Sequence, residues 1–324
     1  MVPPLNVLLA YGLDLLLGDP QLRWHPVRLI GDLALIWKRL FFPWGRLGGL
    51  LTLLLTVLLY TAMVYGLVWL LPPLEAVFLY FFIAHQALAR EAEKVAVALK
   101  AADLPLARYR LSFIVGRDTS CLSVSGCVRA AVETVAENFT DAFVGPLFWY
   151  LLGGLPAVTL YKCTETLDSM FGYRTPRYQA FGFFPARADD FFNFLPARLA
   201  GLFLVLAAWS SGLSWKRALV TMWREARRHD SPNSGFTEAA MAGALGIELG
   251  GEVVYQGKRF EKGRFGRPLK EREVEDIFRA TKLLKRAALW WLLFIFLLEV
   301  VLWRFGYPHL IALITNGLKG VLTA

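Results

Sequence analysis

An uncharged apolar run from Leu47 to Leu71 restricts what this chain can fold into more than any other feature of its sequence. A helix needs roughly 20 apolar residues to cross about 30 Å of hydrocarbon, and this run is longer than that. A second strong run extends from Ala287 to Trp303, with Glu299 as its only charged residue. The chain is 56% hydrophobic and only 19% charged, whereas soluble domains are about a quarter charged. We therefore expect an integral membrane protein.

Shorter apolar runs are weaker candidates for membrane spans. They are Leu5–Leu17, Leu74–Ala89, Phe143–Tyr161, Leu199–Leu213 and Leu310 to the C-terminus. Runs of this length are as often buried helices or re-entrant segments as true spans. Glycine and proline interrupt the third run, and such backbone is tolerated at membrane depth only where protein or water covers it. We expect an all-α, polytopic protein with re-entrant or buried helices, forming a single domain over residues 1–324.

The distribution of Lys and Arg predicts the topology, because cytoplasmic loops retain basic residues. The segment before Leu47 and residues 90–117 are basic, whereas the turn Pro72–Glu75 between them has no Lys or Arg. The turn is therefore expected outside, and the next apolar run returns the chain. Residues 162–198 and 216–286 are also basic, so the apolar runs beside them should dip in and return, or pack as buried helices. We expect an inner-membrane protein whose catalytic loops face the cytoplasm.

Charge, cysteine and histidine usage exclude several other classes. The formal charge of +9 is explained by cytoplasmic loops that meet anionic lipid, and no nucleic-acid recognition signature accompanies it. The three cysteines form no CxxC pair and are expected to be free thiols. The four histidines fit no zinc pattern, so no structural metal is expected. The first apolar run lacks a basic flank and a cleavage site, so it should remain in the protein.

Charged residues recur every four positions near the end of residues 116–141 and climb one slowly turning face of a predicted helix. They are Arg129, Glu133, Glu137 and Asp141. An exposed ladder of salt bridges is one interpretation. The intervening residues are apolar or small, however, and closely spaced carboxylates repel one another unless they share a cation or a proton. Magnesium is the natural cation, because it prefers oxygen ligands and bridges to substrate phosphates.

A second polar cluster lies between Tyr161 and Arg198, among several phenylalanines. Asp189 and Asp190 are adjacent, and Asn193 follows three residues later. Arg187 and Arg198 flank the acids, and paired acids with arginines suit a metal–phosphate site. The alternative is a helix cap at Asp189 with a salt bridge to Arg187.

Two smaller motifs complete the set. The N-terminal sequence DLLLGDPQLRWHPVRLIG contains His25 in a turn that its prolines enforce after an apolar helix. Further along, SPNSG precedes an Ala-rich helix and contains Ser231 and Asn233. A turn of this composition is either an anion cradle at a helix N-terminus or an ordinary N-cap.

These motifs carry a family resemblance. In order, DLLLGDPQLRWHPVRLIG, GRDTS, ETVAENFTD, TLDSMFGYR, ARADDFFNFLPARL and SPNSGFTEAAMAGALG resemble the motifs of the adenosylcobinamide-phosphate synthase family, the CobD/CbiB group of cobalamin synthesis. The resemblance covers Asp14 to Gly251. Glu165 departs from it, since Asn is expected there, and this change bears on the choice of amino alcohol.

The resemblance implies a carbon–nitrogen ligase that joins adenosylcobyric acid to aminopropanol phosphate, or a close amino-alcohol phosphate, with consumption of ATP. Its Mg²⁺ ligands would come from Glu133, Glu137, Asp141, Asp189 and Asp190. Its substrate and phosphate contacts would come from Arg117, Lys162, Arg187, Arg198, Asn193, Ser231 and Asn233. Proton transfer would fall to Asp168, Glu137 or His25.

The expected partners are the corrinoid, the amino-alcohol phosphate and membrane lipid, together with later membrane enzymes of cobalamin synthesis and a second copy of the chain. Two alternatives remain open. A magnesium-dependent prenyl- or phospho-alcohol transferase would carry a second aspartate-rich DxxxD motif, which the sequence lacks. A transporter would show paired broken helices in two repeated halves, and the sequence shows no repeat.

Overall fold

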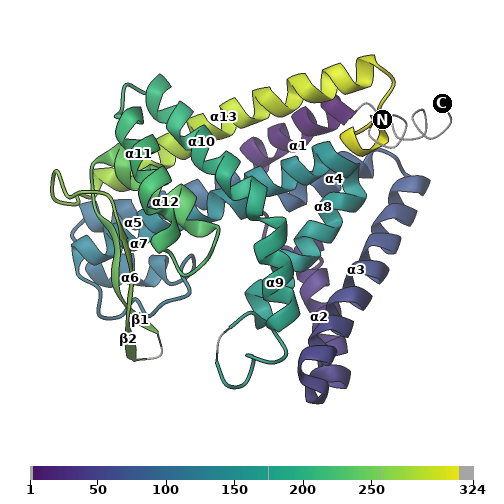
Figure 1. Ribbon diagram of the computed structural model, residues 1–324, viewed down its shortest axis with the longest axis horizontal. Coiled ribbons are helices and arrows are strands. Elements are labelled where there is room, and N and C mark those ends of the chain that lie inside the picture. Colours follow the sequence, from purple (N-terminus) through teal and green to yellow (C-terminus); the bar gives the residue numbers. More distant parts are fainter. Residues whose placement is uncertain (1–2, 174, 256, 314–324) are drawn as a thin grey trace. The chain divides into compact units, whose positions relative to one another are not determined.

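The computed structural model describes residues 3–173, 175–255 and 257–313, which form helices and one β-hairpin (Figure 1). The helices are α1 (Pro3–Leu17), α2 (Pro26–Phe41), η1 (Phe42–Trp44), α3 (Gly45–Leu70), α4 (Leu74–Phe82), α5 (His85–Lys100), α6 (Leu104–Leu111), α7 (Val124–Phe139), η2 (Thr140–Val144), α8 (Gly145–Phe171), α9 (Phe183–Phe192), α10 (Phe194–Ser210), α11 (Trp215–Glu225), η3 (Ala226–Arg228), α12 (Ser234–Leu245) and α13 (Glu275–Arg304). The hairpin strands are β1 (Leu249–Tyr255) and β2 (Lys258–Phe265). The prediction of a helical polytopic membrane protein is confirmed.

Three helical stretches within the described ranges are long and apolar enough to cross a membrane: Pro26–Leu70, Val124–Phe171 and Glu275–Arg304. The first contains α3, which matches the predicted span from Leu47, and the third contains the predicted run from Ala287. Helices α9 and α10 are bent by 46° and add a fourth span if they cross together. Such a bend fits either a broken span or the expected re-entrant segment.

One of the weaker predicted spans has a different form in the structure, and another lies largely outside the described residues. The run Leu74–Ala89 is not one helix, because α4 ends at Phe82 and Ile83 is extended. Nine helical residues extend only about 14 Å, so this weaker candidate does not cross a membrane as one helix. The run from Leu310 lies largely outside the described residues.

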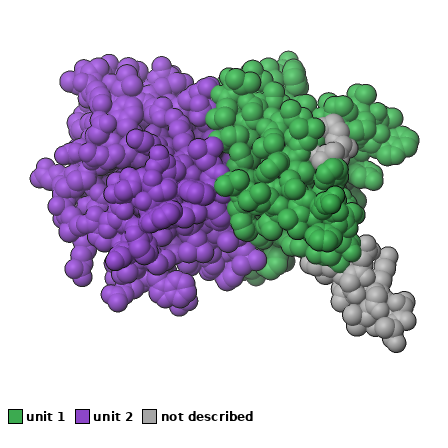
Figure 2. Space-filling view, turned by 90° about the horizontal axis from the view of Figure 1, so that it is seen from above, with its two compact units in different colours: residues 1–84, 145–192, 292–324 green, residues 85–144, 193–291 purple. Residues whose placement is uncertain are grey.

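The chain divides into two compact units, each assembled from segments far apart in sequence (Figure 2). Unit 1 consists of residues 1–84, 145–192 and 292–324. Unit 2 consists of residues 85–144 and 193–291. The single domain expected over residues 1–324 stays a prediction.

Unit 1 is held by close packing of α3 against α2, α8 and α9. A Cβ at Gly49 would lie 1.8 Å from the Phe181 carbonyl oxygen, so glycine alone fits this approach. Tyr60 Oη donates a hydrogen bond to the Pro26 carbonyl at 2.8 Å, and Tyr80 Oη donates to that of Gly18 at 2.8 Å. These two bonds fix the turn between α1 and α2 against neighbouring helices.

Unit 2 surrounds α12, which is buried along almost its whole length because it consists of small residues. The neighbouring backbone leaves no room for a side chain at Gly243, because a Cβ there would lie 2.6 Å from the Arg217 carbonyl oxygen. Helix α7 continues into η2, a π-helical turn. The antiparallel hairpin packs against α7 and α12, and its register is irregular between Leu249 and Gly251.

Candidate functional site

The residues predicted to form the site fall into two groups, one in each unit. Unit 1 contains His25, Lys162, Asp168, Arg187, Asp189 and Asp190. Unit 2 contains Arg117, Glu133, Glu137, Asp141, Asn193, Arg198, Ser231 and Asn233. Each group is described within its own unit.

A pocket of about 240 Å³ in unit 1 lies beside the turn that joins α1 to α2. Its lining includes the charged residues Asp19, Arg28 and Lys162 and the imidazole of His25, and Phe81 adds an aromatic wall. The turn begins at Gly18, which has φ 67°, a conformation that favours glycine. It ends where His25 caps α2, with Nδ1 accepting a hydrogen bond from the Val27 amide at 3.2 Å.

The two ring nitrogens of His25 face different groups. Since Nδ1 accepts a hydrogen bond, Nε2 carries the proton, and Nε2 lies 2.8 Å from Asp19 Oδ1. His25 thus orients the Asp19 carboxylate, whose side chain is 30% exposed and lines the pocket. The sequence placed Asp19 in a motif, but only the structure shows that it lines the pocket beside the imidazole.

Two cationic side chains line the same pocket. Lys162 is 7% exposed, and its Nζ lies 2.7 Å from Glu165 Oε2. Arg28 Nη2 donates a hydrogen bond to Gln21 Oε1 at 2.5 Å. The pocket therefore offers a carboxylate together with two cations, which suits a small molecule that carries both an ammonium and an anionic group.

The remaining predicted residues of unit 1 lie near the ends of α8 and α9. Asp168 is one turn beyond Glu165 on α8, and it packs so closely against Gly172 that a Cβ there would lie 1.9 Å from Asp168 Oδ1. Arg187 Nη1 lies 3.8 Å from Asp190 Oδ2, but the arginine side chain is 70% exposed. A solvent-exposed ion pair of this kind contributes little to stability.

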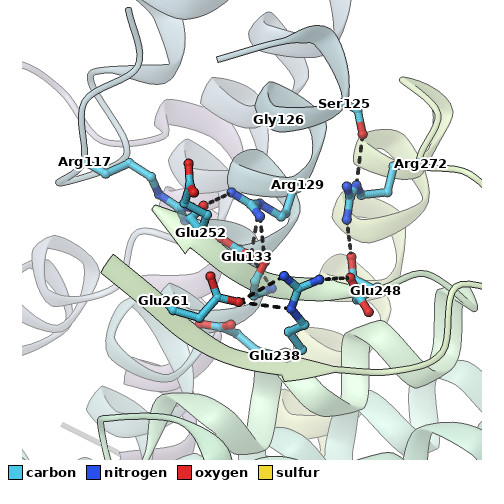
Figure 3. Close-up of polar contacts among 12 residues, drawn as sticks. Arg117, Ser125, Gly126, Arg129, Glu133, Glu238, Glu248, Glu252, Glu261 and Arg272 are labelled. Carbon is cyan, nitrogen blue, oxygen red and sulfur yellow. Dashed lines mark hydrogen bonds and ion pairs between the residues drawn. The ribbon is translucent and has the colours of Figure 1, made fainter. Parts of the chain in front are cut away.

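In unit 2, Arg117 and Glu133 form a buried ion pair (Figure 3). Arg117 Nη2 contacts Glu133 Oε2, and the two side chains are 6% and 3% exposed. Glu133 Oε1 accepts a hydrogen bond from the Gly250 amide at 2.7 Å. The structure thus assigns both residues a positioning role, and their predicted phosphate and metal roles stay predictions.

Arg129 lies on the same face of α7 as Glu133 and hydrogen-bonds this helix to the hairpin (Figure 3). Its Nη1 donates to the Gly250 carbonyl at 2.7 Å, and its Nη2 donates to the Glu252 carbonyl. Arg272 supports the hairpin's start, with Nη1 donating to the Glu248 carbonyl at 2.8 Å. One signal for this arrangement was present in the sequence, the adjacent glycines at 250 and 251, which have φ 82° and 86°.

The next two acids along α7 contact polar side chains from distant segments of unit 2. Ser234 Oγ donates a hydrogen bond to Glu137 Oε1 at 3.0 Å. Asn193 Nδ2 donates to Asp141 Oδ1 at 3.0 Å. Asp141 belongs to the π-helical turn η2, a distortion that is frequent at functional sites. Glu133, Glu137 and Asp141 therefore lie along one polar helix face, and Asn193 lies beside it.

The SPNSG segment forms a capped turn before α12. Ser231 Oγ accepts hydrogen bonds from the amides of Asn233 and Ser234 at 3.2 and 3.3 Å, whereas Asn233, the N-cap residue of α12, makes no side-chain capping bond. Arg198 Nη1 lies 3.5 Å from Asn233 Oδ1. Its guanidinium carbon lies 3.5 Å from the ring centroid of Phe194, which holds the cation beside the turn.

A buried imidazole–carboxyl pair is hydrogen-bonded to this turn. His229 Nε2 lies 3.4 Å from Glu238 Oε1, and His229 Nδ1 accepts a hydrogen bond from the Ser231 amide at 2.9 Å. Burial raises the pKa of Glu238 to about 7. Burial alone would lower the pKa of His229, but the hydrogen bond and charge of Glu238 outweigh it, so the net shift is upward.

No group of three or more His, Cys, Asp or Glu side chains is placed to chelate a metal among residues 3–173, 175–255 and 257–313. Mg²⁺ does not require such a cage, because it usually takes one or two carboxylates plus substrate phosphate oxygens. Glu137 and Asp141, flanked by hydroxyl and amide groups, fit that donor chemistry. Glu133 fits it less well, since Arg117 and Gly250 already contact its two oxygens.

Comparison with known proteins gives consistent relationships across most of the chain. The family model described as CobD/Cbib protein matches residues 7–284. Cobalamin biosynthesis protein CobD of Geobacter metallireducens is 46% identical over 275 residues, covering 82% of this chain and 86% of the relative. CobD of Clostridium perfringens is 38% identical over 292 residues, covering 86% of this chain and 93% of the relative. Cobalamin biosynthesis protein CbiB of Salmonella arizonae is 41% identical over 290 residues, covering 85% of this chain and 91% of the relative.

No solved structure matches the chain. The assignment therefore depends on the family model and on the curated relatives, each of which spans well over two thirds of both sequences. On these grounds, this chain belongs to the CobD/CbiB protein family.

Proposed function

We propose that this membrane protein is a ligase of cobalamin biosynthesis that joins adenosylcobyric acid to aminopropanol phosphate, or a close amino-alcohol phosphate, with ATP hydrolysed to ADP and phosphate. The names of the relatives support a role in cobalamin biosynthesis. The sequence motifs, through their resemblance to adenosylcobinamide-phosphate synthases, support the specific reaction.

The observation that carries the proposal is the pocket of unit 1. Its volume of about 240 Å³ suits an amino-alcohol phosphate and is far too small for a corrinoid. Lys162, Arg28 and Asp19 all line this pocket, and we assign the two cations to the phosphate and the carboxylate to the ammonium. A pocket with this charge arrangement recognises both ends of the proposed small substrate.

Within this pocket, the proposed mechanism begins with proton transfer. An ammonium cannot attack a carboxyl carbon until it loses a proton, and a carboxylate within hydrogen-bond reach can act as the general base. Asp19 takes this role, while His25 holds the carboxylate through Nε2. Lys162, fixed by Glu165, keeps the phosphate end in place while the amine forms the amide bond.

Unit 2 is proposed to bind the nucleotide. ATP supplies the phosphoryl group that turns one carboxylate oxygen of the corrinoid into a leaving group. Glu137 and Asp141 would hold Mg²⁺ against the phosphates, and Arg198 beside the SPNSG turn would contact them as well. In this arrangement the buried pair of His229 and Glu238 positions the turn rather than the substrate.

The test is a turnover assay on detergent-purified protein with adenosylcobyric acid, aminopropanol phosphate, Mg²⁺ and ATP, in which corrinoid mass and ADP are followed together. We expect a corrinoid that gains the amino-alcohol phosphate, with equimolar ADP. Asp19→Asn should lower kcat by roughly 10²-fold or more. The control is Glu91→Gln, which changes an ion pair with Lys94 on α5 and should leave turnover unchanged. Absence of any new corrinoid, also with ethanolamine phosphate, would contradict the proposal.

A further inference from the structure

Unit 1 contains a second cavity, of about 290 Å³, that shares no lining residue with the pocket beside Asp19. One wall is a face of α3 that includes Val64 and Val68, and the opposite wall includes Leu155 of α8. Its titratable groups are Glu75, at the start of α4, His309 and the phenol of Tyr65. Neither the proposed ligase reaction nor the family motifs use any of these residues.

The half-buried polar groups that line this cavity are backed by buried ones. Glu75 Oε1 accepts a hydrogen bond from Tyr150 Oη at 2.9 Å, and Tyr150 Oη in turn accepts one from Asn6 Nδ2 at 3.1 Å. Behind His309 lies Glu299, which is 0% exposed, with Oε1 3.6 Å from His309 Nδ1. Neither oxygen of Glu299 has a hydrogen-bond partner among the described residues. Burying a carboxylate without a hydrogen bond costs free energy unless a cation or a proton compensates its charge.

The backbone at a break in α8 also lines this cavity. Helix α8 is broken at Gly153 and Gly154, and Gly153 lines the cavity. The half-helix before the break ends at the cavity with carbonyl groups that can accept from a cation, and the half-helix after it begins there with Leu155 and Pro156. Gly154 has φ +65°, and a Cβ there would lie 2.4 Å from His309 Nε2. The absence of a side chain at Gly154 therefore leaves room for the imidazole of His309.

The chemistry of the lining restricts the ligand. It includes a carboxylate and an imidazole but neither Lys nor Arg, so phosphates and other anions are disfavoured. The remaining walls are mostly aliphatic or aromatic, with two threonine hydroxyls, and the volume is well above that of a bare metal ion. A ligand that matches both properties has a cationic head and a short apolar body.

We propose that this cavity binds a small protonated alkylamine. Its ammonium donates to Glu75 and to the carbonyl end at the break in α8, with the acid–imidazole pair of Glu299 and His309 behind it. Its hydrocarbon part lies between Val64, Val68 and Leu155. This site is independent of the proposed ligase reaction.

The experiment measures binding of n-butylammonium to the full-length protein in nanodiscs by saturation-transfer NMR, with n-butanol and butyrate as uncharged and anionic matches. We expect saturable binding of the ammonium only. Glu75→Gln, which keeps an acceptor for Tyr150, should weaken binding about tenfold, because a charge-assisted hydrogen bond is replaced by a neutral one. Glu271→Gln, which removes an exposed carboxylate of unit 2, should leave binding unchanged.

A second variant separates loss of the site from loss of the fold. Gly154→Ala places a methyl group where His309 now lies, so it should abolish n-butylammonium binding. The ligase turnover of each variant serves as the check on folding, since neither residue touches the pocket beside Asp19. Equal affinity of wild type and Glu75→Gln, equal binding of n-butanol, or no saturable binding would each overturn the proposal.

Discussion

The buried pair of His229 and Glu238 shows how one side-chain contact can link proton binding to the position of a loop. His229 bridges the Glu238 carboxyl on α12 and the Ser231 amide of the SPNSG turn. Ser231 in turn caps the amides of Asn233 and Ser234. A change in protonation at the pair therefore acts on the turn that lies beside Arg198.

The pair also predicts how stability depends on pH. Burial raises the Glu238 pKa from 4.5 to about 7, and the His229 pKa is raised as well, so the folded protein binds more protons than the unfolded chain over that range. The contribution of this pair to stability is then greatest at low pH and falls as the pH rises from about 4.5 through about 7. Fluorescence-monitored melting should show this fall in wild type and a shallower one in Glu238→Gln. Parallel curves for the two proteins would refute the linkage.

Single residues were predictable from the sequence as candidates but not as partners. The four-residue spacing correctly indicated that Glu133, Glu137 and Asp141 belong to one polar helix face, with the last in a π-helical turn. Their contacts come from Gly250, Ser234 and Asn193, between 52 and 117 positions away. Sequence spacing describes only the neighbours on one helix, so these contacts required the fold.

At the scale of elements, the β-hairpin is the part that hydrophobic patterning missed. Its outer strand, β2, is largely exposed and charged, and therefore resembles a polar loop in sequence. The hairpin depends on backbone contacts, because Arg129 and Glu133 bind carbonyl and amide groups of β1. By contrast, α3 and α13 were predictable because their long apolar runs suffice to specify a helix in a membrane.

The hairpin gives a prediction at Gly250. This residue has φ +82°, and a Cβ would lie 1.9 Å from the Gly263 carbonyl oxygen, so alanine strains β1 and pushes it from β2. We expect Gly250→Ala to destabilise the hairpin by about 1–3 kcal/mol. Hydrogen exchange of residues 249–265 should become faster in this variant and stay unchanged in Lys258→Ala, whose residue is exposed. Unchanged exchange in Gly250→Ala would argue against the observed register.

At the scale of the whole molecule, the bend between α9 and α10 decides the topology. If this pair is re-entrant, the segments before and after it lie on one side of the membrane. If it is a broken span, they lie on opposite sides. The basic residues of 162–198 and 216–286 favour the first arrangement, with both segments in the cytoplasm.

Cysteine labelling tests this topology. Cys121 is exposed while Cys127 and Cys163 are buried, so Cys121→Ser gives a suitable background. We expect Ser169→Cys and Lys216→Cys, both at exposed positions, to react with an impermeant maleimide only when the cytoplasmic face is accessible. Labelling of the two positions from opposite faces would identify α9 and α10 as a span.

The discontinuous composition of the two units has a consequence for biosynthesis. Residues 1–84 leave the ribosome first, but unit 1 also includes residues from 292 onward. Unit 2 ends at residue 291, so all of its segments are translated before unit 1 is complete. Domains generally fold as units during synthesis. The first helices of unit 1 therefore cannot pack against residues 292 onward until all segments of unit 2 have been translated.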